Sequence, residues 1–305
     1  MASENTAGST DQYTFQNPVT RFESITPPAE HTPEPGLDAD IGIKADRGET
    51  SYRGTGRLEG RKALITGADS GIGAAVAIAY AREGADVALS YLPEEEEDAQ
   101  VIKGLIEAEG RTAVCLPGDL KDADYCVSLV QQAVDGLGGL DILVNNAGKQ
   151  IAVETLEELT DEQLDHTYKT NIYSFFRVTK AALKHLPAGS AIINSTSIQA
   201  YEPSPTLVDY ASTKAAINNF TKGLAQQLAP KGIRVNAVAP GPIWTPLQPS
   251  GGQPAEELPE FGKSTPLGRV GQPTELAPAY VFLASAESSY VIGETLNVNG
   301  GMPSP

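Results

Sequence analysis

Tyr210 and Lys214 stand four residues apart in a long helical pattern, so their side chains share one face of the expected helix. A tyrosine phenol titrates at about pH 10 and is a poor base near neutral pH. An ammonium group about 4 Å away would stabilise the phenolate by roughly 4 kcal/mol at an effective dielectric constant of about 20, or about 3 pKa units. The pair is therefore suited to general acid/base catalysis near neutral pH.

A third polar residue, Ser197, precedes this helix. The apolar run at residues 191–193 ends in hydroxyl residues, as a buried strand does where it reaches a cleft. Ser197, at this strand end, could hydrogen-bond the substrate oxygen that Tyr210 protonates. A lone Tyr-x-x-x-Lys pattern is more often a surface feature of an amphipathic helix, so the rest of the chain has to decide between the two interpretations.

From residue 61 onward, short apolar runs alternate with helical patterns. Short strands separated by helices predict a parallel sheet covered on both faces, and right-handed crossovers then give the doubly wound dinucleotide-binding fold. We therefore predict an α/β chain with a single Rossmann-fold domain, residues 58–305, built on a seven-stranded parallel sheet. The expected strands are residues 63–66, 87–91, 112–116, 142–144, 191–194, 233–239 and 295–298, and the expected helices include residues 122–134, 161–186, 207–228 and 273–284.

A glycine-rich loop lies between the first expected strand and the first expected helix, where a phosphate-binding loop is needed. Gly67 would permit a tight turn, Gly71 the close approach of a pyrophosphate, and Gly73 close packing of the helix. The spacing Gly-x-x-x-Gly-x-Gly differs from the general dinucleotide fingerprint. Its position in a strand-turn-helix unit nevertheless makes it a strong indication of a dinucleotide site.

The composition limits the classes of function. A net charge of −17 argues against binding to nucleic acid and to anionic membranes. The chain has no secretory leader pattern and no apolar run as long as a membrane span, so we expect a cytoplasmic protein. Cys115 and Cys126 lack metal-binding spacing and the three histidines are scattered, so no metal site is expected.

Residues 1–57 show neither helical nor strand periodicity and are rich in Pro, Thr, Glu and Gly. Two interpretations remain open, a disordered tail and an extended arm laid over the body or over a neighbouring subunit. Tyr13, Phe15, Phe22 and Ile25 are apolar anchors that a tail would not need, which favours the arm. We expect residues 13–57 to lie extended and to fix quaternary structure without contributing catalytic groups.

Six short segments follow one another in a characteristic order and spacing: Thr66-Gly-Ala-Asp-Ser-Gly-Ile-Gly73, Asn145-Asn-Ala-Gly148, Asn171, Ser197, Tyr210-Ala-Ser-Thr-Lys214 and Pro240-Gly241. Over about residues 58–301 these motifs resemble the short-chain dehydrogenase/reductase family. The segment at residues 48–57 also resembles a bacterial subgroup of general-stress and aldehyde-reductase-like oxidoreductases.

This resemblance implies catalytic roles for four residues. Tyr210 is the expected general acid/base, and Lys214 the residue that lowers the pKa of the tyrosine and binds the nicotinamide ribose. Ser197 would hold the substrate oxygen, whereas Ser195 comes too early in the chain. Asn171 would hold a water molecule in the proton relay.

The resemblance also implies the cofactor contacts. Asp119 would lie beside the adenine, although a helix cap is an alternative role, and Asn145 would either line the adenosine side or tie neighbouring strands. The expected cofactor-binding residues are Gly67, Asp69, Ser70, Gly71, Ile72, Gly73, Tyr91, Asp119, Leu120, Asn145, Ala147, Gly148, Tyr210, Lys214, Pro240, Ile243 and Thr245.

The choice between NAD and NADP depends on the end of the second strand, where an acid favours NAD and an arginine favours NADP. The sequence has Ser90-Tyr91-Leu92 there, with no basic residue nearby and with acids at residues 94–97. NAD is therefore slightly preferred.

Two classes of function remain. The first is an NAD(P)-dependent oxidoreductase that interconverts a carbonyl compound and an alcohol, and the second is a non-catalytic cofactor-binding sensor or scaffold. Residues 149–153, 199–205 and 244–265 should form the substrate pocket, and without clustered arginines they indicate a small neutral substrate. The family resemblance implies a homotetramer built partly through the helices at residues 161–186 and 207–228.

Overall fold

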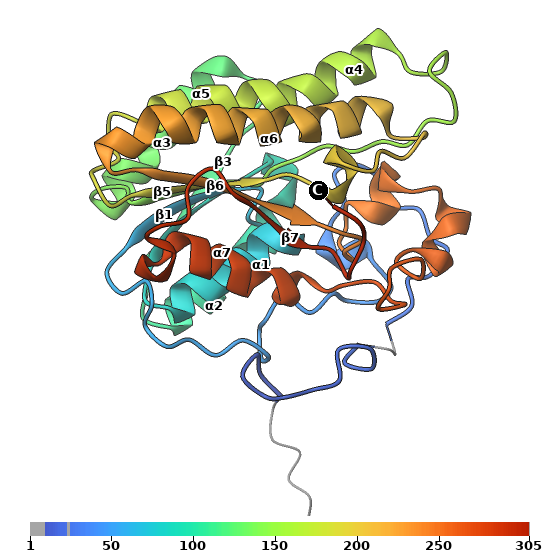
Figure 1. The fold of residues 1–305 in the computed structure, drawn as a ribbon, viewed down its shortest axis with the longest axis horizontal. Coiled ribbons are helices and arrows are strands. Elements are labelled where there is room, and N and C mark those ends of the chain that lie inside the picture. Colours follow the sequence, from blue (N-terminus) through green and yellow to red (C-terminus); the bar gives the residue numbers. More distant parts are fainter. Residues whose placement is uncertain (1–9, 23–24, 305) are drawn as a thin grey trace, which may run out of the picture.

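The computed structural model describes residues 10–22 and 25–304, and Figure 1 shows one central sheet between two layers of helices. In the described part of the chain the sheet has seven strands, all parallel, in the order β3-β2-β1-β4-β5-β6-β7. The seven-stranded parallel sheet predicted from the sequence is therefore confirmed. The strands are β1 (Lys62–Thr66), β2 (Asp86–Tyr91), β3 (Ala113–Pro117), β4 (Ile142–Asn145), β5 (Ala191–Ser195), β6 (Arg234–Pro240) and β7 (Thr295–Val298).

Helices cover both faces of the sheet because each strand is apolar on both faces. In β1, Ala63 and Ile65 pack into one apolar core and Leu64 packs into the other, as the two-residue period of a strand requires. One face carries α1 (Gly71–Arg82), α2 (Glu96–Ala108) and α7 (Pro273–Ala284), and the other carries α3 (Ala123–Leu137), α4 (Asp161–Tyr168), α5 (Ser174–Ala182) and α6 (Val208–Leu228) (Figure 1).

The strand order reverses at β1, which pairs with β2 on one side and with β4 on the other. The connections leaving β1 and β4 therefore diverge to opposite sides of the sheet, which opens a crevice at the carboxyl ends of these strands. All segments that carry the sequence motifs begin at or near this edge.

The single helix expected at residues 161–186 is wrong in detail. The structure has α4, then a π-helical segment at Lys169–Tyr173, then α5, which ends at Ala182. Asn171 lies in the π segment, where its side chain accepts a hydrogen bond from the Lys149 amide (2.7 Å) and donates to the Lys149 carbonyl (2.9 Å). These bonds to another part of the chain stabilise the extra residue in the turn.

The described part of the arm lies extended over the body of its own chain, and its one regular element there is a short 3-10 turn at Asp38–Asp40. Apolar and polar contacts both fix it, and Ile41 and Ala45 of the arm pack with Trp244 in a small apolar core. The buried carboxylate of Glu83, just after α1, accepts hydrogen bonds from the Tyr52 hydroxyl (2.7 Å), the Thr55 amide (2.8 Å) and the Arg57 guanidinium (2.7 Å). Residues 1–9 and 23–24 of the predicted arm, and residue 305, lie outside the described residues.

Within the described residues, no helix is long and apolar enough to cross a membrane.

Candidate active site

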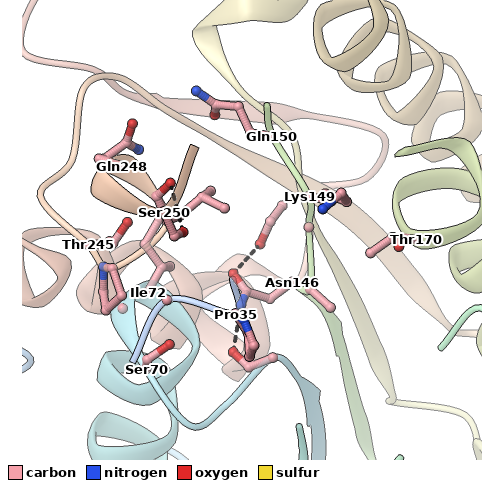
Figure 2. Close-up of a pocket in the computed structure, with 18 of the residues that line it drawn as sticks. Pro35, Ser70, Ile72, Asn146, Lys149, Gln150, Thr170, Thr245, Gln248 and Ser250 are labelled. Carbon is pink, nitrogen blue, oxygen red and sulfur yellow. Dashed lines mark hydrogen bonds between the residues drawn. The ribbon is translucent and has the colours of Figure 1, made fainter. Parts of the chain in front are cut away.

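A cavity of about 630 Å³ opens at the carboxyl edge of the sheet, where the strand order reverses. The glycine loop and the ends of β2, β4, β5 and β6 form its walls (Figure 2). Of the residues expected to bind cofactor, those that line it are Gly67, Asp69, Ser70, Gly71, Ile72, Tyr91, Asp119, Leu120, Ala147, Gly148, Tyr210, Lys214, Pro240, Ile243 and Thr245. The spacing of the motifs along the chain thus corresponds to one site in space.

The glycine loop has the shape that a pyrophosphate needs. Gly67 and Gly71 have φ angles of +62° and +50°, a conformation that glycine adopts without strain. A Cβ on Gly73 would lie 1.8 Å from the Gly67 carbonyl oxygen, so only glycine lets α1 pack this closely on the loop. The N-terminus of α1 therefore faces the cavity with free amide groups, which suits an anionic diphosphate. Gly73 itself supports the loop from behind and does not line the cavity.

Asn145 and Asn146 divide two roles between them. The Asn145 amide group donates to Thr179 (3.0 Å) and to Asn194 (2.9 Å), so it ties β4 to β5 and α5, and it does not line the cavity. Of the two roles left open for Asn145, the geometry therefore gives it the tie between strands. Asn146, which the sequence reasoning missed, lines the cavity and donates to the Gly67 carbonyl (3.0 Å).

The end of the cavity that is formed by the residues after β2 and β3 has an acidic and aromatic wall. Tyr91, at the end of β2, donates its hydroxyl hydrogen bond to Glu96 (2.8 Å). Asp119 lines the cavity and forms an ion pair with Lys121 (3.3 Å); its carboxylate also caps the backbone amide of Lys121 (2.8 Å). Asp69 is almost fully buried, and one of its carboxylate oxygens has no hydrogen-bond partner in the described structure.

Ser197, Tyr210 and Lys214 come together on the opposite wall. Ser197 follows β5, and α6 carries Tyr210 and Lys214 one turn apart, with the Lys214 ammonium 5.3 Å from the centre of the Tyr210 ring. The Lys214 ammonium donates to the Ser195 carbonyl (3.1 Å), which fixes it against the strand end. All three functional side chains are at least nine-tenths buried and line the cavity.

The electrostatics of this pair differ from the simple two-charge expectation. Burial raises the pKa of Tyr210 to about 12, and the hydrogen bond with Ser197 acts in the opposite direction. Burial also lowers the pKa of Lys214 to about 8. In the protein without cofactor, desolvation of the phenol is therefore the largest effect on the pKa of Tyr210, and the lowering of that pKa by Lys214 stays a prediction.

Asn171 does not line the cavity, but it holds a residue that does. Its side chain bonds both backbone groups of Lys149 and also donates to Thr213 (3.1 Å), which lies between Tyr210 and Lys214 on α6. Asn171 thus couples the loop after β4 to the catalytic helix. The four residues of the expected catalytic set belong to one connected region of the structure.

The side of the cavity where the substrate is expected has both polar and apolar walls. Gln150, Gln248 and Ser250 contribute polar groups (Figure 2), and Leu247 and Phe261 contribute apolar surface. The Trp244 end of the expected substrate loop is different, because Trp244 is fully buried and its ring N–H donates to the Ile43 carbonyl of the arm (2.7 Å). Trp244 therefore anchors the arm and does not contact the cavity.

Three arm residues, Glu34, Pro35 and Gly36, also line the cavity. The sequence reasoning missed them, because no motif or periodicity marks this part of the chain. The part of the chain that the structure describes contains no cluster of three or more potential metal ligands.

A family model described as Enoyl-(Acyl carrier protein) reductase matches residues 67–303. The chain belongs to the short-chain dehydrogenase/reductase family. It is 51% identical to General stress protein 39 of Bacillus subtilis, over 93% of this chain and 98% of that protein. It is 44% identical to NADPH-dependent aldehyde reductase 1, chloroplastic, of Arabidopsis thaliana, over 88% of this chain and 95% of that protein.

A solved short-chain dehydrogenase from Burkholderia cenocepacia, in complex with NADP, has the same fold. It is 36% identical, superposes with a TM-score of 0.75, and covers 80% of this chain and 98% of that one. The predicted family, its general-stress and aldehyde-reductase-like subgroup and the oxidoreductase class are therefore confirmed. The protein is a short-chain dehydrogenase/reductase that binds NAD(P) and acts on CH–OH and C=O groups.

Proposed function

We propose that the protein interconverts a small neutral aldehyde or ketone and the corresponding alcohol, with Tyr210 as general acid/base. The observation that carries this proposal is that Ser197, Tyr210 and Lys214 line the same cavity as the glycine loop. A carbonyl group and a nicotinamide cofactor would therefore share one enclosed space. A purely cofactor-sensing protein would have no need for the three buried polar groups at the far end of it.

The side chains divide the work of the reaction. The bound nicotinamide supplies hydride in reduction and accepts it in oxidation. Ser197 donates a hydrogen bond to the substrate oxygen, and the Tyr210 hydroxyl gives that oxygen its proton in reduction. Lys214 stabilises the phenolate that remains, because the buried ammonium lies beside the ring. Asn171 holds the loop after β4 against α6, the helix that carries Tyr210 and Lys214.

A small neutral substrate is supported by the chemistry of the wall. Among the described residues that line the cavity there is no arginine, and the lysines at its edge have carboxylate or carbonyl partners. Glutamine and serine side chains can bind hydroxyl and carbonyl groups without a net charge. The aldehyde reductase name of the Arabidopsis relative supports the same substrate class.

We also propose NAD over NADP as the preferred cofactor. The wall at the end of β2 contains Glu94 and Glu95, and no arginine is among the described residues that line the cavity. A 2′-phosphate would bring about two negative charges to an acidic wall, at a cost to affinity. The Arabidopsis and Burkholderia relatives are named with NADPH and NADP, so binding of NADH and NADPH has to be measured side by side.

The test of the reaction is the substitution Tyr210→Phe. It removes the proton donor and leaves the ring in place, so the rate of NADH or NADPH oxidation with a panel of aldehydes and ketones should fall by about 10³-fold or more. Cofactor affinity, measured by nicotinamide fluorescence, should stay within about threefold of wild type, because the substitution should change the free energy of cofactor binding by less than about 1 kcal/mol. The matched control is Tyr168→Phe, whose hydroxyl contacts Ser212 on the outer face of α6.

Undiminished reduction by Tyr210→Phe would refute the proposed mechanism. Cofactor binding without any carbonyl-dependent turnover in the wild-type protein would favour the sensor or scaffold.

A homotetrameric state and a cytoplasmic location are part of the same proposal, supported by the family resemblance and by the acidic composition.

A further inference from the structure

Residues 32–38 of the arm, which we call the strap, run beside the cavity. Glu34, Pro35 and Gly36 form part of the cavity wall, and Figure 2 shows Pro35 among the side chains that surround the space. Contacts join the strap to three different segments of the body. These contacts determine what the strap can do.

The first contact is with the loop after β6. The Thr32 amide donates to the Pro249 carbonyl (3.0 Å), and the Thr32 side chain is buried. At Gly36 the strap lies so close to this loop that a Cβ would be 2.5 Å from the Pro246 carbonyl oxygen and 2.8 Å from the Ser250 hydroxyl oxygen. Glycine is therefore required at Gly36 for this packing.

The second contact crosses to the loop after β4. The Glu34 carboxylate forms an ion pair with the Lys149 ammonium, and the backbone of Lys149 is fixed by Asn171. The Lys149 side chain is 13% exposed and the Glu34 side chain 48% exposed. The pair is thus partly shielded from solvent and connects the strap to the catalytic side of the cavity.

The third contact is with α2. The Asp38 amide donates to the Asp98 carboxylate (2.7 Å), and the Asp38 carboxylate pairs with Arg47 (2.6 Å). Asp38 and Asp98 are both more than nine-tenths buried, so this end of the strap is firmly held. The strap therefore spans from the substrate loop to the adenosine side of the cavity.

We propose that the strap is the outer wall of the cofactor site and slows dissociation of the bound dinucleotide. This inference rests on the nicotinamide cofactor of the proposed function. A cofactor seated on the glycine loop occupies the cavity that the strap borders, so release requires the strap contacts to open or to deform. The matched family region begins at residue 67, so the strap lies outside it.

The experiment measures the dissociation rate of NADH directly, with no turnover. The protein is loaded with NADH, mixed rapidly with a large excess of NAD, and followed by NADH fluorescence. Gly36→Ala forces the strap away from the Pro246 carbonyl, so NADH should leave at least about fivefold faster, the change expected from losing one typical contact. The matched control is Gly42→Ala in the same arm, where the atom nearest to an added Cβ is the movable end of the Glu30 side chain at 3.0 Å.

A second variant tests the strap with less risk to folding. Glu34→Gln removes the charge that pairs with Lys149 and should raise the NADH dissociation rate by about two- to fivefold at low salt, as for a partly exposed ion pair. The difference from wild type should shrink at high salt. Glu30→Gln is the control, because Glu30 contacts the Gly42 amide and does not line the cavity.

Wild-type dissociation rates in both Gly36→Ala and Glu34→Gln would overturn the proposal. If Gly36→Ala does not fold, as judged by its melting curve, Glu34→Gln alone decides. Faster release without carbonyl turnover would leave the strap proposal standing and refute the reaction. A protein that binds neither NADH nor NADPH would refute both.

Discussion

Ser195 and Ser197 are two residues apart, yet the structure gives them different surroundings. The Ser195 hydroxyl donates to Asn146 (3.0 Å) and lies 2.6 Å from the Tyr280 hydroxyl, so it links β5 to β4 and α7. The Ser197 hydroxyl accepts a hydrogen bond from the Gln199 amide, and its hydrogen bond with Tyr210 acts to lower the pKa of that phenol. One serine is thus committed to structure, and the other is available to the substrate oxygen.

We expect Ser197→Ala to lower kcat by about 10²-fold, because one hydrogen bond to the developing oxyanion is lost. Ser195→Ala should instead lower the free energy of unfolding by about 1–2 kcal/mol, with kcat within about threefold of wild type. Steady-state kinetics and denaturant melts on both variants check this. Equal loss of kcat in the two variants would contradict the division of roles.

Lys214 gives a second prediction, on pH. Its pKa is about 8 in the folded protein, against 10.5 for an unperturbed lysine, so between these values the unfolded chain binds more protons than the native one. The contribution of Lys214 to the free energy of unfolding should therefore rise with pH in this window, by up to about 1.4 kcal/mol per pH unit, whereas burial of Cys126, which raises the pKa of its thiol to about 11, acts in the opposite direction. Denaturant melts between about pH 8 and pH 9.5, compared between wild type and Lys214→Met, isolate the contribution of Lys214.

Lys214→Met should remove this rise, because it deletes the buried amine. The control is Lys222→Met, which changes an exposed lysine on the same helix and should leave the slope intact. A wild-type slope in Lys214→Met would show that another group titrates in this window.

At the level of elements, the sheet was predictable because short apolar strands alternate with helical periods along the chain. The break at Lys169–Tyr173 was not, since it depends on bonds from Asn171 to Lys149 and Thr213, which are distant in sequence. A helical period carries no information about such contacts. The expected helix end at residue 186 also lies beyond the observed end of α5 at Ala182.

Contacts between residues distant in sequence also explain which parts of the site could not be predicted. The glycine loop, Ser197, Tyr210 and Lys214 carry their chemistry in short motifs, so the sequence was enough to bring them together. Asn146 stands in a recognised motif, and its contact with the Gly67 carbonyl needed the fold. The strap has no periodicity, and its anchors are all in other segments.

Glu83 joins two elements, α1 and the arm, and provides an element-scale prediction. Burial acts first to raise its pKa, but hydrogen bonds from Arg57, Tyr52 and Thr55 overcome this and lower the pKa to about 2. The pKa of an unperturbed glutamate is 4.5, so between about pH 2 and pH 4.5 the unfolded chain binds more protons at Glu83 than the native protein does. The stabilisation is therefore complete above about pH 4.5 and is lost as the pH falls towards 2.

Glu83→Gln should lower the free energy of unfolding at neutral pH by about 3 kcal/mol, because a buried charge network loses its anion. The difference from wild type should narrow below about pH 4. Urea melts at several pH values measure both effects. The control is Glu287→Gln, since Glu287 is 55% exposed and lies 3.7 Å from the same Arg57.

On the scale of the whole molecule, the net charge of −17 favours solubility and keeps copies apart by repulsion. Interfaces between identical subunits are enriched in apolar and aromatic surface. One such surface lies on the outer side of α5 and α6, where Phe176 is 53% exposed and packs on Phe220 with ring centres 4.4 Å apart. Tyr173, 45% exposed, lies just before α5.

This surface is where we expect the homotetramer to form, and Phe176→Glu tests it. A charge there would be buried without a partner in an interface, so the variant should have a smaller mass in solution than wild type, as measured by size exclusion with light scattering. Val101→Glu is the matched control, because Val101 is also 53% exposed but lies on α2, on the opposite face of the sheet (Figure 1). If the mass of Phe176→Glu equals that of wild type, subunits associate elsewhere or not at all. If both variants dissociate, added negative charge alone is responsible, because a chain with a net charge of −17 already repels its copies.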